Sequence, residues 1–484
     1  MASERLSTGI PGLDELLHGG LLPRQTYLLR GGSGTGKTIL GLHFLTQGVA
    51  AGEPSLLITL GEQEDQIRRN AAALGFDLTG VSILDLTPEP GFFARVETYD
   101  IFSPGEVERE PITHKITEWI DRVQPQRIFL DALTQFRYLS PDSFQFHKQT
   151  LSFLKFMVDR GATVLYTSEH SQQTPDDDMQ FLSDGVIHLE NNGGQRSVCV
   201  SKFRGSDFRS GRHSLRLGGR GMEVFPRLSP QAHGRTFSLD AIGSGVAELD
   251  ALLNGGLERG TTTIITGPTG VGKSTAAALF AREAARHGER SVIYLFDEAR
   301  ETLVRRCESI GIPVRSMLDQ GMLGVVEVEA LQYTPDEFAQ LVRSEVEHRT
   351  ARIVIIDSVA GYRVGLGGEN LVTHLHALCR YLQNMGVTVI LVHEQPAITG
   401  DFAVTEDGFS YLADNLVFLR YLEINGQMRK AIGVLKKRLS DFEKTLREYE
   451  INREGVKVGR PLTGLRGILL GVPEWVREPG GEVR

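Results

Sequence analysis

The stretch Gly31-Gly32-Ser33-Gly34-Thr35-Gly36-Lys37-Thr38 decides the fold of this chain, because the same pattern returns as Gly267-Pro268-Thr269-Gly270-Val271-Gly272-Lys273-Ser274. Both stretches match G-x-x-x-x-G-K-[ST], a loop whose backbone wraps around nucleotide phosphates. The lysine of such a loop reaches the β- and γ-phosphates, and the hydroxyl after it is a ligand of Mg²⁺. The helix that follows adds free N–H groups that favour negative charge. We therefore predict two nucleoside-triphosphate sites, and we count Thr275 into the second.

The repeat extends well beyond the two loops. Lys37 and Lys273 lie 273 − 37 = 236 positions apart, and at this offset Gly9 matches Gly245. Further matches pair Leu13-Asp14 with Leu249-Asp250, Leu16-Leu17 with Leu252-Leu253, Gly19-Gly20-Leu21 with Gly255-Gly256-Leu257, Glu62 with Glu298, and Gly75 with Gly311. A period this long indicates two whole domains rather than a solenoid of short units.

The composition limits the classes of function. The chain has 484 residues, a formal net charge of −9 and a pI of about 5.9. This acidic balance argues against a dedicated nucleic-acid binder, for which a basic domain is typical. The three cysteines are far apart and offer no metal-ligand or disulfide spacing. We see neither a secretory signal nor a run of about 18 apolar residues that could span a membrane, and we expect a soluble cytoplasmic protein.

Apolar strands alternate with amphipathic helices in the same order in both halves. Strands are predicted at 25–29, 55–60, 127–130 and 162–166, then at 262–265, 292–296, 352–356 and 388–392; helices are predicted at 39–51, 67–74 and 147–159, then at 275–287, 302–310 and 371–384. This alternation predicts an α/β fold with a mostly parallel sheet covered on both faces. Each half then ends in an antiparallel hairpin, at 186–203 and at 416–435, with Asn-Gly-type turn signals between the strands.

The boundary between the domains is expected near Leu228, inside the Gly- and Pro-containing stretch 218–235. We predict a first domain at 1–228, a linker at 229–237 and a second domain at 238–460. The tail at 461–484 contains several Pro and Gly residues and is expected to be irregular.

Aspartates end two of the apolar strands, Asp131 in the first half and Asp357 in the second. A carboxylate at the C-terminal edge of a parallel sheet is typical of the second Mg²⁺-associated group of a P-loop site. We therefore predict that Asp131 acts with Thr38, and Asp357 with Ser274, at a metal ion. The alternative is a loop or helix-capping aspartate.

A second acidic position follows another strand in each half. The second half offers Asp297 and Glu298 there, whereas the first offers Glu62 after Gly61. A carboxylate beside the γ-phosphate can orient or deprotonate the attacking oxygen. Three carboxylates are thus candidate catalytic groups, and the alternative is that they are solvated loop residues.

Basic pairs occur at the end of the last predicted hairpin strand of each half. They are Lys202 with Arg204 and Lys436 with Arg438. Alternation places both members of a pair on one face of the strand. Such a pair could neutralise transition-state charge in the manner of an arginine finger supplied in trans. The alternative is a solvated charge at a sheet edge.

Together these motifs resemble the KaiC family of RecA-like ATPases over nearly the whole chain. The resemblance is carried by the two P-loops, by the opening STGIPGLDELLHGGL at 7–21, by FLSDGVIHL at 181–189 and by the Lys-x-Arg-Gly-Ser run that follows. The run REYEINREGVKVGRPLTGLRGILLGVP at 447–473 is similar to the broad bacterial and archaeal branch. The resemblance implies two tandem RecA-like domains that bind ATP with Mg²⁺.

The family's assembly is a double-ring homohexamer with ATP between neighbouring subunits. The resemblance therefore implies self-association, with both basic pairs reaching the γ-phosphate of a neighbour. The family's paired catalytic glutamates fall on Asp297-Glu298 and on Gly61-Glu62, so the first glutamate is missing in domain 1.

The family's Ser-Thr autophosphorylation pair falls on Ser410-Tyr411. The same place in domain 1 is Gln180-Phe181, which has no hydroxyl acceptor of that kind. If the chain phosphorylates itself, we therefore expect domain 2 to do so on Ser410.

Three functions remain open at this stage. The leading hypothesis is a hexameric ATP-hydrolysing signalling switch with serine autokinase activity in domain 2 and a protein partner of unknown identity. The second is a nucleic-acid motor or recombinase, against which the acidic balance argues. The third is a scaffold that binds ATP only to assemble, which suits the gap at Gly61.

Overall fold

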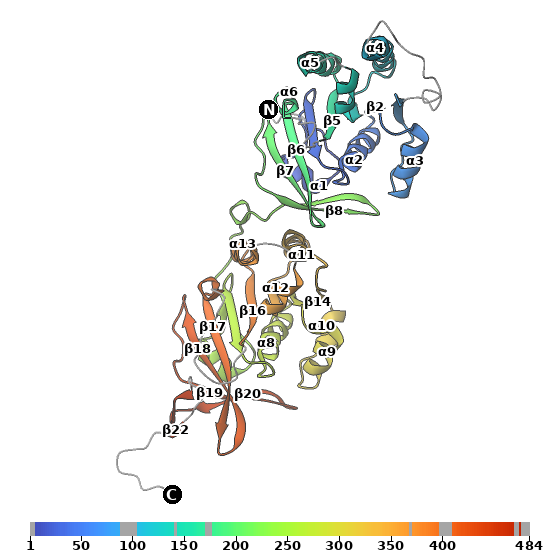
Figure 1. Cartoon of the computed structure of the whole chain (residues 1–484). Coiled ribbons are helices and arrows are strands. Elements are labelled where there is room, and N and C mark those ends of the chain that lie inside the picture. The colour runs from blue at the N-terminus through green and yellow to red at the C-terminus, as the bar shows by residue number, and fades with distance from the viewer. Residues whose placement is uncertain are drawn as a thin grey trace, which may run out of the picture. The chain divides into compact units, whose positions relative to one another are not determined.

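The structure is a computed structural model that describes residues 5–87, 104–139, 143–169, 177–366, 370–395, 409–468 and 474–475. The chain divides into two compact units, Met1–Arg227 and Leu228–Arg484. Each unit is an α/β domain, so the predicted fold class is confirmed (Figure 1). Within these described ranges, no helix is both long and apolar enough to cross a lipid bilayer.

A nine-stranded sheet with the order β3-β2-β4-β5-β1-β6-β7-β8-β9 forms the first unit. The strands are β1 Thr26–Gly31, β2 Ser55–Thr59, β3 Val81–Asp85, β4 Arg127–Asp131, β5 Thr163–Glu169, β6 Gly185–Asn192, β7 Gln195–Phe203, β8 His213–Gly218 and β9 Gly221–Phe225. The pairs from β3 to β6 are parallel and the later pairs are antiparallel. The hairpins at the C-terminal end of the domain therefore extend a parallel sheet.

Helices cover both faces of this sheet. They are α1 Pro11–Leu16, α2 Lys37–Ala50, α3 Glu64–Ala73, α4 Pro104–Val123, α5 Ser143–Asp159 and α6 Met179–Leu182, with the 3₁₀ helix η2 Leu133–Leu139. Alternate residues of a strand face opposite sides. Accordingly Leu29 and Phe129 belong to the core cluster that contains α2, whereas Leu28 and Ile128 belong to the cluster that contains α4 and α5.

The second unit repeats the arrangement, with the sheet order β14-β13-β15-β16-β12-β17-β18-β19-β20. Its strands are β10 Ala241–Ile242, β11 Leu257–Glu258, β12 Thr262–Gly267, β13 Ser291–Leu295, β14 Leu323–Glu327, β15 Ile353–Asp357, β16 Thr388–Glu394, β17 Asn415–Ile424, β18 Gln427–Lys437, β19 Arg447–Asn452 and β20 Gly455–Pro461. Its helices are α7 Ala247–Leu252, α8 Lys273–Arg286, α9 Arg300–Glu308, α10 Val314–Asp319, α11 Pro335–Glu347, α12 Val359–Gly365 and α13 Leu371–Asn384, with the 3₁₀ helices η3 Pro230–Ala232 and η4 Phe409–Leu412.

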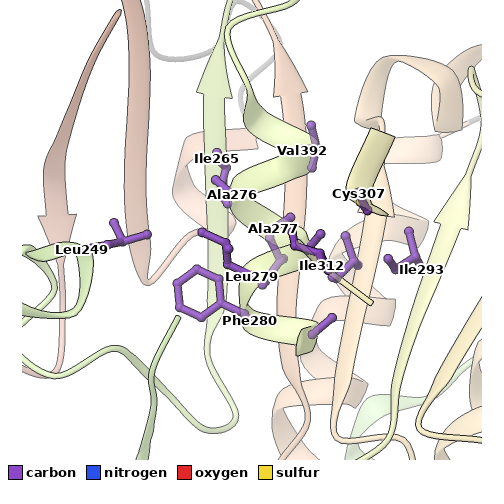
Figure 2. Close-up of a cluster of buried hydrophobic side chains, with 14 of the residues drawn as sticks. Leu249, Ile265, Ala276, Ala277, Leu279, Phe280, Ile293, Cys307, Ile312 and Val392 are labelled. Carbon is purple, nitrogen blue, oxygen red and sulfur yellow. The ribbon is translucent and has the colours of Figure 1, made fainter. Parts of the chain in front are cut away.

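Small side chains let α8 lie close to this second sheet. Ala276 and Ala277 are almost fully buried on the helix, and Phe280 fills space beside them. All three belong to the same buried cluster as Ile265 of β12 and Val392 of β16, which Figure 2 labels beside them. Because α8 begins at the P-loop lysine, this packing holds the loop against the sheet.

The predicted boundary, linker and tail contain regular structure. The stretch 218–235, within which the boundary was placed near Leu228, contains β9 with the buried residues Met222 and Val224, and the two compact units divide between Arg227 and Leu228. The segment predicted as a linker contacts the second unit, because the backbone N–H of Arg235 donates to the carbonyl oxygen of Asn384. The predicted tail begins with the end of β20 and contains the short strands β21 Leu465–Arg466 and β22 Glu474–Trp475, while its remaining residues lie mostly outside the described ranges.

Candidate nucleotide-binding and catalytic site

The first P-loop joins the end of β1 to the start of α2. Gly34 and Gly36 have φ angles of 71° and 102°, a left-handed conformation that favours glycine. The Nζ of Lys37 donates to the carbonyl oxygens of Gly31 and Gly32 at 2.7 and 2.8 Å. A cavity of about 460 Å³ lies over this loop. The ammonium group is thus inside the loop, where nucleotide phosphates bind in P-loop proteins.

The second P-loop joins β12 to α8 in the same way. The Nζ of Lys273 donates to the carbonyl oxygen of Pro268 at 2.8 Å, and the residue is only 8% exposed. Burial lowers the pKa of Lys273, while the carboxylates of Glu394 and Asp357 act in the opposite direction. Glu394, at the end of β16, also accepts a hydrogen bond from Thr269 of the loop.

A hydroxyl and a carboxylate, the two groups for which a metal-associated role was predicted, meet beside each P-loop. The Oγ1 of Thr38 donates to Asp131 at 2.6 Å, and Thr167 of β5 donates to the other oxygen of the same carboxylate at 2.6 Å. In the second unit, burial raises the pKa of Asp357 and a hydrogen bond from Ser274 opposes that shift. Oxygen donors of this kind fit Mg²⁺, which binds through one or two protein groups together with substrate phosphates.

The acidic pair of the second unit follows β13. Asp297 accepts a hydrogen bond of 2.6 Å from the hydroxyl of Ser358, the residue after Asp357. Glu298 forms an ion pair of 2.9 Å with Arg306 of α9. Burial raises the pKa of Glu298, the nearby Asp357 adds to the increase, and Arg306 opposes it. A carboxylate with a raised pKa suits the transfer of a proton near neutral pH.

The first unit has a counterpart of Glu298, which is Glu62, but no carboxylate at the position of Asp297. Glu62 is exposed, lines the cavity over the P-loop, and accepts a hydrogen bond of 3.4 Å from Asn70. Gly61 stands where Asp297 stands in the second unit, since both come two residues after the end of the corresponding strand. The only candidate base that the sequence offered for domain 1 is therefore solvated.

Both basic pairs lie far from the P-loop of their own unit. Tyr27, near the start of β1, pairs with Gly185, and Gly185 pairs with Phe203, between Lys202 and Arg204. The P-loop follows the opposite end of β1. Four residue steps, about 13 Å of strand, separate Tyr27 from the end of β1 at Gly31, and the P-loop lies beyond that end, so the pair is not at the site of its own unit.

The second unit has the same arrangement. Thr263 of β12 pairs with Asn415, and Asn415 pairs with Lys437, between Lys436 and Arg438. Burial, and then the neighbouring arginine, lower the pKa values of Lys202 and Lys436.

Each basic pair contacts the backbone of the segment that corresponds to the family's acceptor pair. Arg438 donates to the carbonyl oxygen of Tyr411 at 3.5 Å, and Lys436 donates to that of Ala413 at 2.6 Å. In the first unit Lys202 donates to the carbonyl oxygen of Gln180 at 2.8 Å. Tyr411 is 54% exposed, whereas the side chain of Ser410 lies outside the described part of the structure.

Sequence reasoning missed several residues that shape these sites. Gln135 lines the cavity over the first P-loop, and Ser358 binds Asp297, but neither belongs to a motif with a fixed spacing. The end hairpins also reach the loops: the hydroxyl of Tyr449, on β19, donates to the carbonyl oxygen of Gly272 at 3.4 Å. Of these residues, only Ser358 could have been found from the sequence, because a serine directly before a helix is a common N-cap.

Fold and site together define a class of protein: tandem P-loop ATPase domains, each with a lysine inside the loop and a hydroxyl–carboxylate pair of a kind suited to Mg²⁺. Comparison with known families identifies the particular one. The family described as "ATPase: KaiC" matches residues 6–229 and 242–463, so the chain belongs to the KaiC family. It is a KaiC-like ATPase that binds nucleotide through a duplicated domain, and family membership implies the general use of ATP and Mg²⁺.

Curated relatives match along at least nine tenths of their length. The circadian clock protein KaiC3 of Synechocystis sp. is 26% identical, over 98% of this chain and 95% of the relative. The circadian clock oscillator protein KaiC of Prochlorococcus marinus (strain MIT 9313) is 26% identical, over 99% and 97%. The KaiC of Rippkaea orientalis is 27% identical, over 97% and 91%. This chain is thus similar to whole proteins of that name and not to one of their domains.

Proposed function

We propose that this protein is a homohexameric, ATP-hydrolysing signalling switch with serine autokinase activity in domain 2, and that Ser410 is the acceptor. We further propose that it acts in the cytoplasm on a protein partner, and that it belongs to the broad bacterial and archaeal branch of the family. A nucleic-acid partner fits poorly with the net charge of −9. The observation that carries the autokinase proposal is the contact of Arg438 with the backbone of Tyr411, next to Ser410.

In domain 2, Lys273 binds the β- and γ-phosphates, while Ser274 and Asp357 are the groups that would hold Mg²⁺. When bound, the metal ion offsets phosphate charge. Asp297 or Glu298 takes the proton from the attacking oxygen, which belongs to Ser410 or to water. The raised pKa of Glu298 supports its share of this role.

The positions of the basic pairs support action between subunits. Lys436 and Arg438 stand at the edge of the sheet where β12 begins, whereas the P-loop stands at the edge where β12 ends. A group that stabilises charge on the γ-phosphate must therefore come from another copy of the chain. Heterologous contacts of this kind form a closed ring when the rotation between neighbouring subunits closes, as the proposed hexamer requires. Because Arg438 is bonded to the segment that carries Ser410, the neighbour that brings the arginine also brings the acceptor.

Phosphopeptide mapping after incubation with Mg·ATP tests the autokinase. We compare the wild type with Lys273→Ala and with Lys457→Ala, a surface-lysine control whose ammonium group pairs with Glu454. Phosphate on Ser410 in the wild type and the control, but not in Lys273→Ala, is the expected result. Released phosphate without any modified peptide would leave an ATPase switch without kinase activity. Phosphorylation of Lys273→Ala at the wild-type level would show that the proposed mechanism is wrong.

A further inference from the structure

The two catalytic positions differ by a reciprocal exchange of side chains. In the second unit, Asp297 faces Gly361 of α12 across the site. A Cβ added at Gly361 would lie 2.5 Å from Oδ2 of Asp297 and 2.4 Å from the Cβ of Phe296. The carboxylate of Asp297 in this position therefore requires a glycine at residue 361.

In the first unit the glycine and the side chain have changed places. Gly361 comes four positions after Asp357, and Gln135 comes four positions after Asp131, so the two residues correspond. Opposite it stands Gly61, where a Cβ would lie 2.9 Å from Nε2 of Gln135. Gln135 is half-buried and lines the cavity over the P-loop. Its amide thus takes the space that a carboxylate takes in the second unit.

A third difference accompanies this exchange. Ser358, which donates to Asp297, corresponds to Ala132 in the first unit. The hydroxyl is therefore missing from the same unit as the carboxylate that it would bind. The other member of the acidic pair differs as well: Glu298 is paired with Arg306, whereas among the residues that the structure describes Glu62 accepts a hydrogen bond from the amide of Asn70 at 3.4 Å.

We propose that Gln135 occupies the catalytic-carboxylate position of domain 1 and makes this domain a site that holds ATP with little turnover. In hydrolysis the water oxygen bonds to the γ-phosphorus while the bond to the β–γ bridging oxygen breaks, and its electron pair leaves with ADP. The proton of the water needs an acceptor. A carboxylate takes that proton, whereas a neutral amide does not. The inference rests on the proposed ATPase function and assigns its turnover to domain 2.

The test measures ATP turnover by the full chain in a Lys273→Ala background, which leaves domain 1 as the active site. Gln135→Glu replaces the amide by a carboxylate of nearly the same shape, and Gln135→Ala is the matched control. We expect Gln135→Glu to raise kcat on the order of 10²-fold, the usual contribution of a general base. Because phosphate binding is unchanged, KM for ATP is expected to stay within about twofold.

A second variant tests the same proposal in case Gln135→Glu does not fold. Gly61→Asp/Ala132→Ser/Gln135→Gly copies the arrangement of the second unit, and nucleotide retained through gel filtration reports whether domain 1 is intact. The proposal is supported if kcat increases in either of these two variants and does not increase in Gln135→Ala. Turnover at the background rate in variants that retain ATP would overturn it, as would equal acceleration in Gln135→Ala.

The same experiment separates this inference from the proposed function. Failure of the wild type and of Lys37→Ala to hydrolyse ATP would refute the ATPase assignment itself. The role of Gln135 alone would be refuted if the wild type hydrolyses ATP through Lys273 but the Gln135 variants leave kcat unchanged.

Discussion

Glu298 is the residue whose environment predicts a measurable pH dependence. Burial and the charge of Asp357 raise the pKa of Glu298, and the guanidinium of Arg306 limits the increase. If the ionised carboxylate is the base, turnover falls as the pH drops through this raised pKa. Removal of Arg306 takes away the opposing charge, so the pKa rises further and the acid limb of the pH–rate profile moves to higher pH.

We expect Arg306→Ala to move the acid limb of kcat/KM upward by about one pH unit, the usual effect of one adjacent opposite charge. Turnover is followed in a Lys37→Ala background, so that domain 2 alone contributes. Arg305→Ala is the matched control, because Arg305 is 78% exposed and pairs with Glu301 instead. A profile identical to that of the control would exclude Glu298 as the base.

Residues in motifs were predictable because their spacing along the chain is itself the signal. Lys37 and Lys273 follow from one pattern, and Asp131 and Asp357 from the end of an apolar strand, and the structure brings each carboxylate to the hydroxyl expected beside it. Their catalytic roles stay predictions. Gln135 was not predictable, because its position depends on the meeting of segments that are more than 70 residues apart.

At the scale of elements, α12 connects the architecture of the second unit to its chemistry. Ser358 is the N-cap of this helix: its hydroxyl accepts from the backbone N–H of Gly361 at 3.0 Å and donates to Asp297 at 2.6 Å. One side chain therefore stabilises the helix and orients a candidate catalytic carboxylate.

Ser358→Ala is expected to cost about 1 kcal/mol of stability, the usual effect of removing an N-cap. We also expect kcat of domain 2 to fall while KM for ATP changes little, because Asp297 loses its hydrogen bond. Thermal unfolding and steady-state kinetics measure the two effects, and Ser316→Ala, an exposed serine on α10, is the control. If Ser358→Ala lowers stability but leaves kcat unchanged, Ser358 caps the helix and has no role in orienting Asp297 for catalysis.

The central strands and helices were predictable for a physical reason. A parallel strand that is buried on both faces must be apolar along its length, and β4 and β15 read in that way. The hairpin β8–β9 was not predicted, since it lies at the sheet edge and β9 falls inside the Gly- and Pro-containing stretch 218–235, whose composition favours a domain boundary. Its burial depends on contact with the P-loop: a Cβ at Gly36 would lie 2.9 Å from Cε of Met222.

At the scale of the whole molecule, the two units carry the same fold with unequal catalytic groups. This inequality predicts a division of labour, in which ATP held by domain 1 supports assembly and domain 2 performs the turnover. Lys37→Ala is then expected to make the hexamer dissociate more readily on dilution, while at concentrations where the ring persists the hydrolysis of domain 2 stays within about twofold, because removal of uniform binding changes kcat little. Native mass spectrometry and phosphate release measure both, with the exposed Lys155→Ala as control. An intact hexamer that has lost most of its turnover would refute the division.

Complementation between subunits tests the proposed ring most directly. Lys273→Ala removes the ATP site of domain 2 but keeps Arg438, whereas Arg438→Ala keeps the site and removes the basic group. Neither variant alone has a complete site. In hexamers reassembled from equal amounts, about a quarter of the interfaces join an intact site to an intact Arg438, if the contacts are heterologous. We therefore expect about a quarter of wild-type turnover in the mixture.

The direction of phosphate transfer gives the same experiment a second readout. Arg438 is bonded to the backbone beside Ser410, so the chain that supplies the arginine also supplies the acceptor. Phosphate is then expected on the Lys273→Ala chain, which cannot bind ATP in domain 2 itself, and the two chains are distinguished by mass. A mixture of Lys273→Ala with the double variant Lys273→Ala/Arg438→Ala is the control and is expected to stay inactive. Phosphate found only on the Arg438→Ala chain would mean that each subunit modifies itself, and the proposed contact between neighbours would be wrong.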